Sequence, residues 1–87
     1  MKLIFAILKD DDVDTVVQAL TSASFRVTRV ASTGGFFRKG STTLLIGVDD
    51  DQVQAAIEVL RENTTIEPNE PKRATVFVVP VSQFEQL

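Results

Sequence analysis

The residue types best suited to chemistry in this sequence are gathered in residues 25–43. Four of the nine basic residues lie there within 14 positions, in a chain whose net charge is −3. Arginine pairs with phosphate through two parallel hydrogen bonds, consecutive glycines bring backbone amides close to an anion, and aromatic rings stack on bases. The segment therefore fits a nucleotide site. A β-ribbon with a Gly-Gly turn and inward-packed phenylalanines explains the same composition equally well.

Two runs of three aspartates, residues 10–12 and 49–51, are the second candidate. Three adjacent carboxylates could bind Mg²⁺ or Ca²⁺. Each run, however, follows an apolar stretch and precedes an amphipathic pattern, where acidic side chains cap free amides and interact favourably with the helix dipole. We therefore expect two helix starts, with the aspartates as N-cap candidates, and we predict neither a metal site nor a cofactor.

The composition excludes several classes of protein. The chain has no histidine and no cysteine, which removes zinc sites of the usual ligand types, disulfides and catalysis by those side chains. None of its carboxylates or lysines is visibly paired with an activated hydroxyl, and no Gly-Lys-Ser/Thr follows the spacing of a Walker loop. We expect a binding protein that is not an enzyme, and its acidity disfavours nucleic acid as a partner.

Length and hydropathy predict one small domain covering residues 1–87. Residues 3–8 form an apolar run, but the charged residues 9–12 end it without a cleavage signal. No other apolar stretch approaches the roughly 20 residues that a membrane-spanning helix needs. We expect a cytoplasmic protein with no membrane span.

The hydrophobic periodicity predicts alternating strands and helices. Apolar runs or β-branched alternation indicate strands at 3–8, 25–31, 42–48 and 75–79. Apolar residues at helical spacing follow each aspartate run, ending near residues 23 and 60, and a polar loop with two prolines covers 63–73.

These elements give the order β-α-β-β-α-β, which is the ferredoxin-like α+β sandwich. The two halves also begin alike, because an apolar strand and three aspartates precede each helix. We expect one antiparallel sheet with both helices on one face. The open face would then carry apolar side chains that a symmetric partner could cover.

Four stretches of the chain resemble the bacterial PII-like cyclic-di-AMP receptors. They are residues 1–7, 25–28, 31–43 and 74–81, which read MKLIFAI, FRVT, ASTGGFFRKGSTT and ATVFVVPV. The resemblance implies a non-enzymatic signal-transduction protein with a ferredoxin-like fold, assembled as a homotrimer. It also implies that cyclic di-AMP binds in clefts between subunits and that an unknown protein target receives the signal.

The resemblance further implies which residues contact the ligand. Arg26 and Thr28 would lie near the phosphates and ribose, and Phe77 and Gln86 would close the pocket. Two family asparagines are replaced here by serines, whose hydroxyl cannot present the paired donor and acceptor of an amide. The full set of expected ligand-binding residues is Ser24, Arg26, Val27, Thr28, Gly35, Phe36, Phe37, Ser41, Gly47, Phe77 and Gln86.

The chain also differs from the family in the connection at 63–73, which is short and contains Pro68 and Pro71. A large ligand-driven rearrangement of that loop, as in the family, is not expected. Two alternatives to cyclic di-AMP therefore stay open. One is a sensor of a mononucleotide such as ATP or ADP, and the other is a structural trimer that has lost ligand binding.

Overall fold

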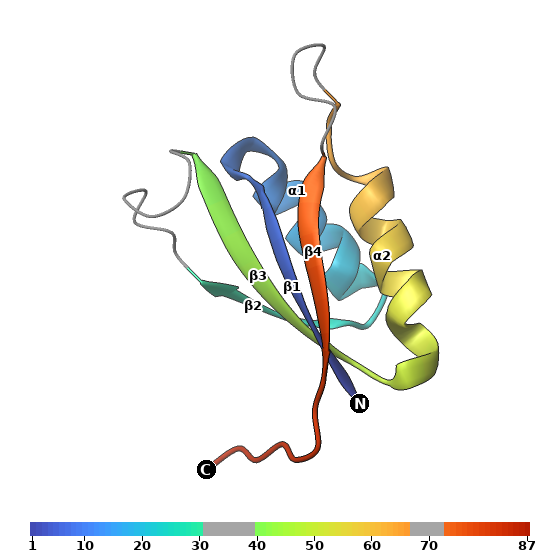
Figure 1. Ribbon diagram of the computed structural model, residues 1–87. Coiled ribbons are helices and arrows are strands. Elements are labelled where there is room, and N and C mark those ends of the chain that lie inside the picture. Colours follow the sequence, from blue (N-terminus) through green and yellow to red (C-terminus); the bar gives the residue numbers. More distant parts are fainter. Residues whose placement is uncertain (31–39, 67–72) are drawn as a thin grey trace.

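A computed structural model describes residues 1–30, 40–66 and 73–87, and the remaining residues are drawn in grey in Figure 1. The described residues form four strands, two α-helices and a short 3₁₀ turn. In chain order these are β1 (Lys2–Lys9), α1 (Asp10–Ser22), β2 (Arg26–Val30), β3 (Ser41–Val48), η1 (Asp50–Gln52), α2 (Val53–Glu62) and β4 (Ala74–Pro80).

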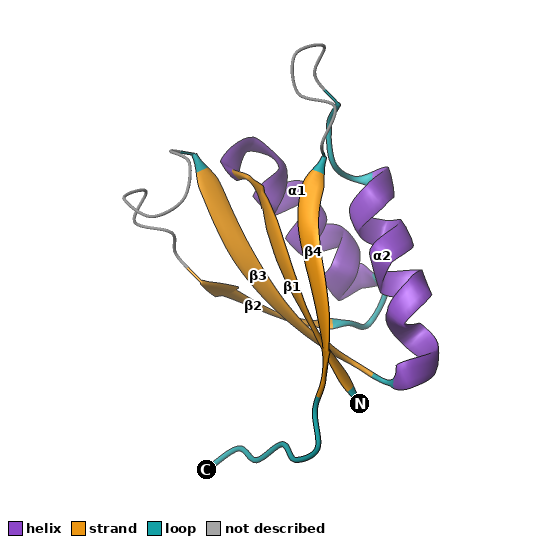
Figure 2. Cartoon of the chain, in the orientation of Figure 1, coloured by secondary structure: helices purple, strands orange, loops and turns teal. Residues whose placement is uncertain are grey.

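The strands form a sheet in the order β2-β3-β1-β4, and every neighbouring pair is antiparallel. Both helices lie against the same face of the sheet (Figure 2). This is an α+β architecture compatible with the predicted ferredoxin-like fold. No helix in the described part of the chain has the length and apolar character needed to cross a membrane.

The core lies between the sheet and the helices because alternate strand residues point toward the helices. Along β1 the burial alternates, and Ile4, Ala6 and Leu8 face the core. Both helices contribute apolar residues at helical spacing to this core. The buried hydrophobic residues are Ile4, Ala6, Leu8, Val13, Val16, Leu20, Leu44, Ile46, Val48, Ala56 and Leu60.

The opposite face of the sheet is also apolar, as the sequence predicted. Phe5 lies at its centre, paired with Leu45 of β3 on one side and with Phe77 of β4 on the other. Phe77 is 55% exposed and Val79 on the same strand is 37% exposed. We call this surface the open face.

The predicted strands differ from the observed ones mainly at their ends. Strand β2 begins at Arg26 rather than at residue 25, and its predicted last residue, 31, lies outside the described residues. Strand β3 includes Ser41, which the sequence had suggested belonged to the preceding loop. Of the predicted loop at 63–73, the described residues 63–66 and 73 have no helix or strand.

The expectation that aspartates act as N-caps is wrong for the first run and holds only by position for the second. Both helical segments begin at their aspartate runs. The N-cap residue is Lys9 for α1 and Asp49 for η1, and neither makes a side-chain capping hydrogen bond. In the first run, residues 10–12 lie inside the first turn of α1, where their charge still favours the helix dipole. Their side chains are free to bond elsewhere.

The aspartates of α1 instead connect the helix start to two other segments. The Thr42 hydroxyl donates to the Asp10 carboxylate, and the Asp10 amide donates to the Gly40 carbonyl at 2.6 Å. The Asp12 carboxylate is buried and accepts from the Thr65 amide at 3.1 Å and from the Thr65 hydroxyl at 3.2 Å. The β1–α1 junction therefore holds both the start of β3 and the chain that follows α2.

Candidate functional site

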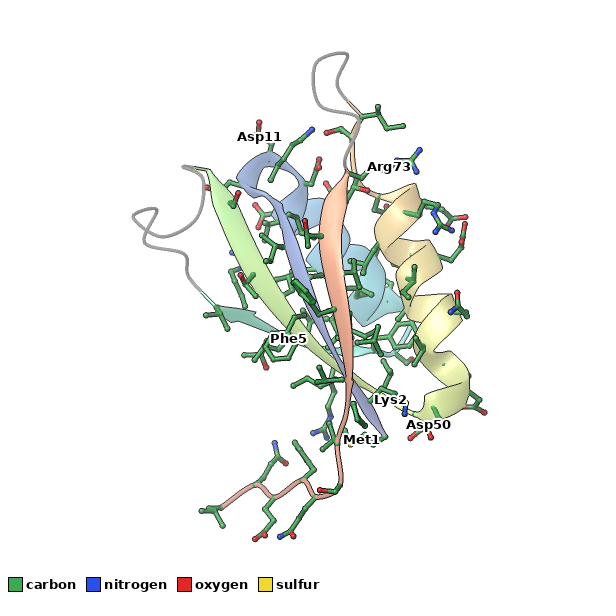
Figure 3. The ribbon with its side chains drawn as sticks, in the orientation of Figure 1. Met1, Lys2, Phe5, Asp11, Asp50 and Arg73 are labelled. Atoms are coloured by element: carbon green, nitrogen blue, oxygen red, sulfur yellow. The ribbon has the colours of Figure 1, made fainter. Side chains whose placement is uncertain are left out.

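A pocket of about 270 Å³ lies where β2 begins and β3 ends. Three of the predicted ligand-binding residues, Ser24, Arg26 and Gly47, line it together. Figure 3 shows Met1, Lys2 and Asp50 at this same end of the sheet. The pocket is lined by Met1, Ala23, Ser24, Phe25, Arg26, Gly47, Val48, Asp49 and Gln52.

The turn between α1 and β2 shapes one wall of the pocket. Ser24 adopts a left-handed backbone conformation with φ of 69°, which is uncommon for a residue other than glycine. Its amide donates to the Thr21 carbonyl at 3.0 Å, and the Phe25 amide donates to the Leu20 carbonyl at 2.9 Å. These bonds reverse the chain tightly, so that Arg26 enters β2 directly opposite Gly47 of β3.

The two arginines of β2 have different surroundings. Arg29 pairs with Asp14 of α1 at 2.8 Å, which places it on the helix side of the sheet. Arg26 has the opposite strand parity, lines the pocket and is exposed. Arg26 is therefore positioned to meet an anionic ligand, whereas Arg29 already has an anionic partner.

The start of the chain closes the other side of the pocket. The α-amino group of Met1 contacts the Asp50 carboxylate at 2.9 Å. That hydrogen bond, together with the positive charges of Lys2 and the amino group, lowers the pKa of Asp50 below its usual value. The Met1 side chain lies over Gly47. Its terminal methyl group would be 3.1 Å from a Cβ atom added at residue 47.

Two more predicted residues share the open face but not the pocket. Thr28 of β2 pairs with Leu45 of β3. Leu45 in turn pairs with Phe5 of β1, and Phe5 pairs with Phe77 of β4. Thr28 and Phe77 therefore lie in one row, at opposite edges of the sheet. Three strand spacings of about 4.8 Å separate them by roughly 14 Å. One ligand group cannot touch both within a single chain.

The remaining predicted residues are dispersed or not described. Ser41 opens β3 at the far end of the sheet from Gly47, about 20 Å away at roughly 3.3 Å per residue. The Val27 side chain packs toward the core, so only its backbone is available to a ligand. Gln86 is exposed in the extended tail after β4 (Figure 1). Gly35, Phe36 and Phe37 lie outside the described residues.

The pocket also contains residues that sequence reasoning did not select, among them Phe25 and Gln52. Phe25 directly precedes Arg26, so its position beside a phosphate-binding candidate was a usable signal. Gln52 gave no such signal, because only the fold brings η1 next to the α1–β2 turn. Its amide carries a donor and an acceptor on two neighbouring atoms, whereas the Ser24 hydroxyl carries both on one oxygen.

Carboxylates of the second aspartate run border the pocket but do not form a metal site. Within the described ranges 1–30, 40–66 and 73–87, no group of three or more acidic, histidine or cysteine side chains could hold a metal ion. The described lining supplies hydrogen-bonding groups, the guanidinium of Arg26 and part of the Phe25 ring, which also packs against the core.

Two comparisons with known proteins agree with this architecture. Residues 1–70 match the model of a protein family described as cyclic-di-AMP receptor. The fold is similar to the crystal structure of a functionally unknown protein from Pediococcus pentosaceus ATCC 25745. That similarity has a TM-score of 0.80 and 30% sequence identity, and it covers 99% of this chain and 96% of the other.

Proposed function

Since the chain belongs to the cyclic-di-AMP receptor family, we propose that it is a PII-like signalling protein that binds cyclic di-AMP between the subunits of a homotrimer. In this proposal residues 1–87 are one PII-like domain of ferredoxin-like fold, working in the cytoplasm. Binding is relayed to a protein partner and no reaction is catalysed. The receptor family is a binding family, which agrees with this role.

The observation that best supports the proposal is the pocket that joins Ser24, Arg26 and Gly47 at the edge of the sheet. An exposed guanidinium there can pair with a phosphate of the dinucleotide. The adjacent Phe25 packs against the core and lines the pocket, so only the exposed part of its ring can contact a base. Two other positive groups of this region are already paired, Arg29 with Asp14 and the Met1 amino group with Asp50.

The distribution of the other residues supports a site between subunits. Thr28 and Phe77 are at opposite edges of one sheet, and the tail that carries Gln86 extends away from its own chain. Both edges can contribute to one ligand only if neighbouring copies meet there. The proposed contacts are side chains of Ser24, Arg26, Thr28, Ser41, Phe77 and Gln86, and backbone of Val27, Gly35, Phe36, Phe37 and Gly47.

One observation favours a second candidate, a sensor of ATP or ADP. The pocket wall at residue 24 carries a hydroxyl where the family has an amide, so one adenine contact of the dinucleotide is weakened. A mononucleotide needs only one base site beside Arg26.

Calorimetric titration of the intact protein with cyclic di-AMP, ATP and ADP tests the function. We expect saturable heat with cyclic di-AMP and weaker or no binding of the mononucleotides. Binding of ATP or ADP alone would favour the second candidate. Absence of heat with all three ligands would leave a structural trimer without a nucleotide site.

Replacement of Arg26 provides a sharper test of the pocket. Arg26→Ala should weaken cyclic di-AMP binding by roughly 1.5–3 kcal/mol, about 10- to 150-fold, because a charge-assisted hydrogen bond to phosphate is lost. The matched control is Arg29→Ala on the same strand, which removes an arginine bonded to Asp14 and should leave affinity nearly unchanged. Equal affinities for both variants would remove Arg26 from the site.

A further inference from the structure

A second pocket, of about 240 Å³, lies between α2 and β4 at the opposite end of the molecule from the Arg26 pocket. Apolar side chains, here called its floor, form part of its lining, together with two arginines, Arg61 and Arg73. No carboxylate is among the described residues that line it. These residues are Ile57, Leu60, Arg61, Thr64, Arg73, Ala74 and Val76.

Arg73 in this pocket has a hydrogen-bond donor without an acceptor in the described part of the chain. Its Nε atom is buried and has no hydrogen-bond partner among the described residues. A buried donor without an acceptor costs about 1–3 kcal/mol, and such groups in native proteins are usually explained by a bound water or ion. Figure 3 shows Arg73 where β4 begins, beside the end of α2.

Two carbonyls near the end of α2 accept hydrogen bonds from side chains that follow the helix. The Asn63 side-chain amide donates to the Val59 carbonyl at 2.8 Å, and the Thr64 hydroxyl donates to the Leu60 carbonyl at 2.8 Å. Arg61 is paired with Glu58 along the helix at 2.7 Å. The first two of these bonds go to the Val59 and Leu60 carbonyls, and neither involves Arg73.

We propose that this pocket binds a small organic anion, in which an oxyanion is carried on a compact apolar body. The oxyanion pairs with the Arg73 guanidinium at the pocket wall, with Arg61 adding positive charge at the rim. The apolar body lies on Leu60 and Val76. A volume of about 240 Å³ equals roughly eight waters of about 30 Å³ each, which suits a single-ring ligand and is too small for a dinucleotide.

Nuclear magnetic resonance of the ¹⁵N-labelled protein tests this site directly. The full-length protein is titrated at constant ionic strength with benzoate, phenyl phosphate or inorganic phosphate. We expect benzoate and phenyl phosphate to shift the Arg73 Nε–Hε signal saturably, with a Kd near 1 mM, a free energy of about −4 kcal/mol. Benzoate and phenyl phosphate represent the two oxyanion sources, and the tighter of them identifies which one the site prefers.

Inorganic phosphate should bind at least about fivefold more weakly than phenyl phosphate, because it places no apolar surface on the floor of the pocket. Equal binding of both phosphates would overturn the assignment of an organic ligand. Absence of a saturable shift with any of the three probes would overturn the site itself.

Variants separate this pocket from the nucleotide site. Arg73→Gln should weaken binding at least about tenfold, followed through the backbone amides of Thr64 and Ala74. Arg61→Gln, on the helix surface, should weaken it severalfold without risk to folding. Arg26→Gln, in the other pocket, should have no effect. Unchanged benzoate binding in Arg73→Gln and Arg61→Gln would refute the proposal, whether or not cyclic di-AMP binds elsewhere.

Discussion

Among single residues, Ser24 best shows how backbone and ligand requirements meet at one position. Its φ of 69° belongs to the left-handed region, which asparagine tolerates better than most residues because its short side chain bonds locally. The resemblance to the PII-like cyclic-di-AMP receptors implies an asparagine at this position in that family. Serine keeps the turn but loses the amide that could read an adenine edge.

Ser24→Asn should therefore strengthen the proposed binding of cyclic di-AMP, by about 1 kcal/mol or roughly fivefold, because a second hydrogen bond to the base becomes possible. The free energy of unfolding should stay within about 0.5 kcal/mol of the wild type, since the left-handed conformation suits asparagine. Calorimetry and urea denaturation measure the two effects.

Ser22→Asn, at the exposed end of α1, is the matched control and should not change affinity. A Ser24→Asn protein that binds no more tightly than the wild type would show that residue 24 does not contact the base.

At the scale of elements, the junction of β1 and α1 organises one end of the molecule. Asp10 is bonded to the segment that leads into β3, and Asp12 to the segment that leaves α2. Both contacts come from one turn of helix, so the two segments are held in fixed positions relative to each other. The aspartate run is thus a structural connector, in place of the cap that its sequence suggested.

Asp12→Asn should lower the free energy of unfolding by about 1–3 kcal/mol, because Asp12 is only 4% exposed and its charged acceptor is bonded twice by Thr65. Asp11→Asn in the same run is the control, and this exposed position should change stability by less than about 0.5 kcal/mol. Urea denaturation of both variants gives the comparison. Equal losses would mean that charge at the helix start, rather than the Thr65 contact, is what matters.

At the scale of the whole molecule, the open face is the feature that most needs a partner. It places Phe5, Leu45 and Phe77 side by side across three strands, with the helices on the other side of the sheet. A chain of this length buries only about 60–65% of its unfolded surface alone. A homotrimer that covers the open face would supply the missing burial.

Leu45→Gln, at the centre of this face, should weaken assembly at least about tenfold, because each subunit loses roughly 1.5–3 kcal/mol of apolar burial. Sedimentation velocity should show a trimer for the wild type at micromolar concentration and a shift toward monomer for the variant. Gln54→Ala, on the exposed surface of α2, should sediment like the wild type. A monomeric wild type would contradict both the assembly and a site between subunits.

The sequence predicted the fold well because its signals are local. Alternation and apolar runs located all four observed strands to within a few residues, and helical spacing located Val16, Leu20 and Leu60 in the core. The capping role of the first aspartate run was predicted wrongly, because the acceptor role of Asp12 depends on Thr65, which is distant in the sequence.

The candidate site was less accessible to sequence reasoning. Ser24, Arg26 and Gly47 were selected and do meet in one pocket, but Gln52 was not selected, because η1 reaches the pocket only through the fold. Arg73 was overlooked for a similar reason. Its significance is that its Nε is buried without a partner, a property that no spacing of residues reveals.

The strand order has a consequence for how the protein is made. Strand β1 leaves the ribosome first, yet its two neighbours in the sheet are β3 and β4, and β4 is completed only at Pro80. Until β3 is made the apolar residues of β1 lack both neighbouring strands, and until β4 is made they still lack one. Contacts between distant segments also form slowly. Newly synthesised chains should therefore depend on chaperones or α1 to shield this strand, and truncation before β4 should favour aggregation.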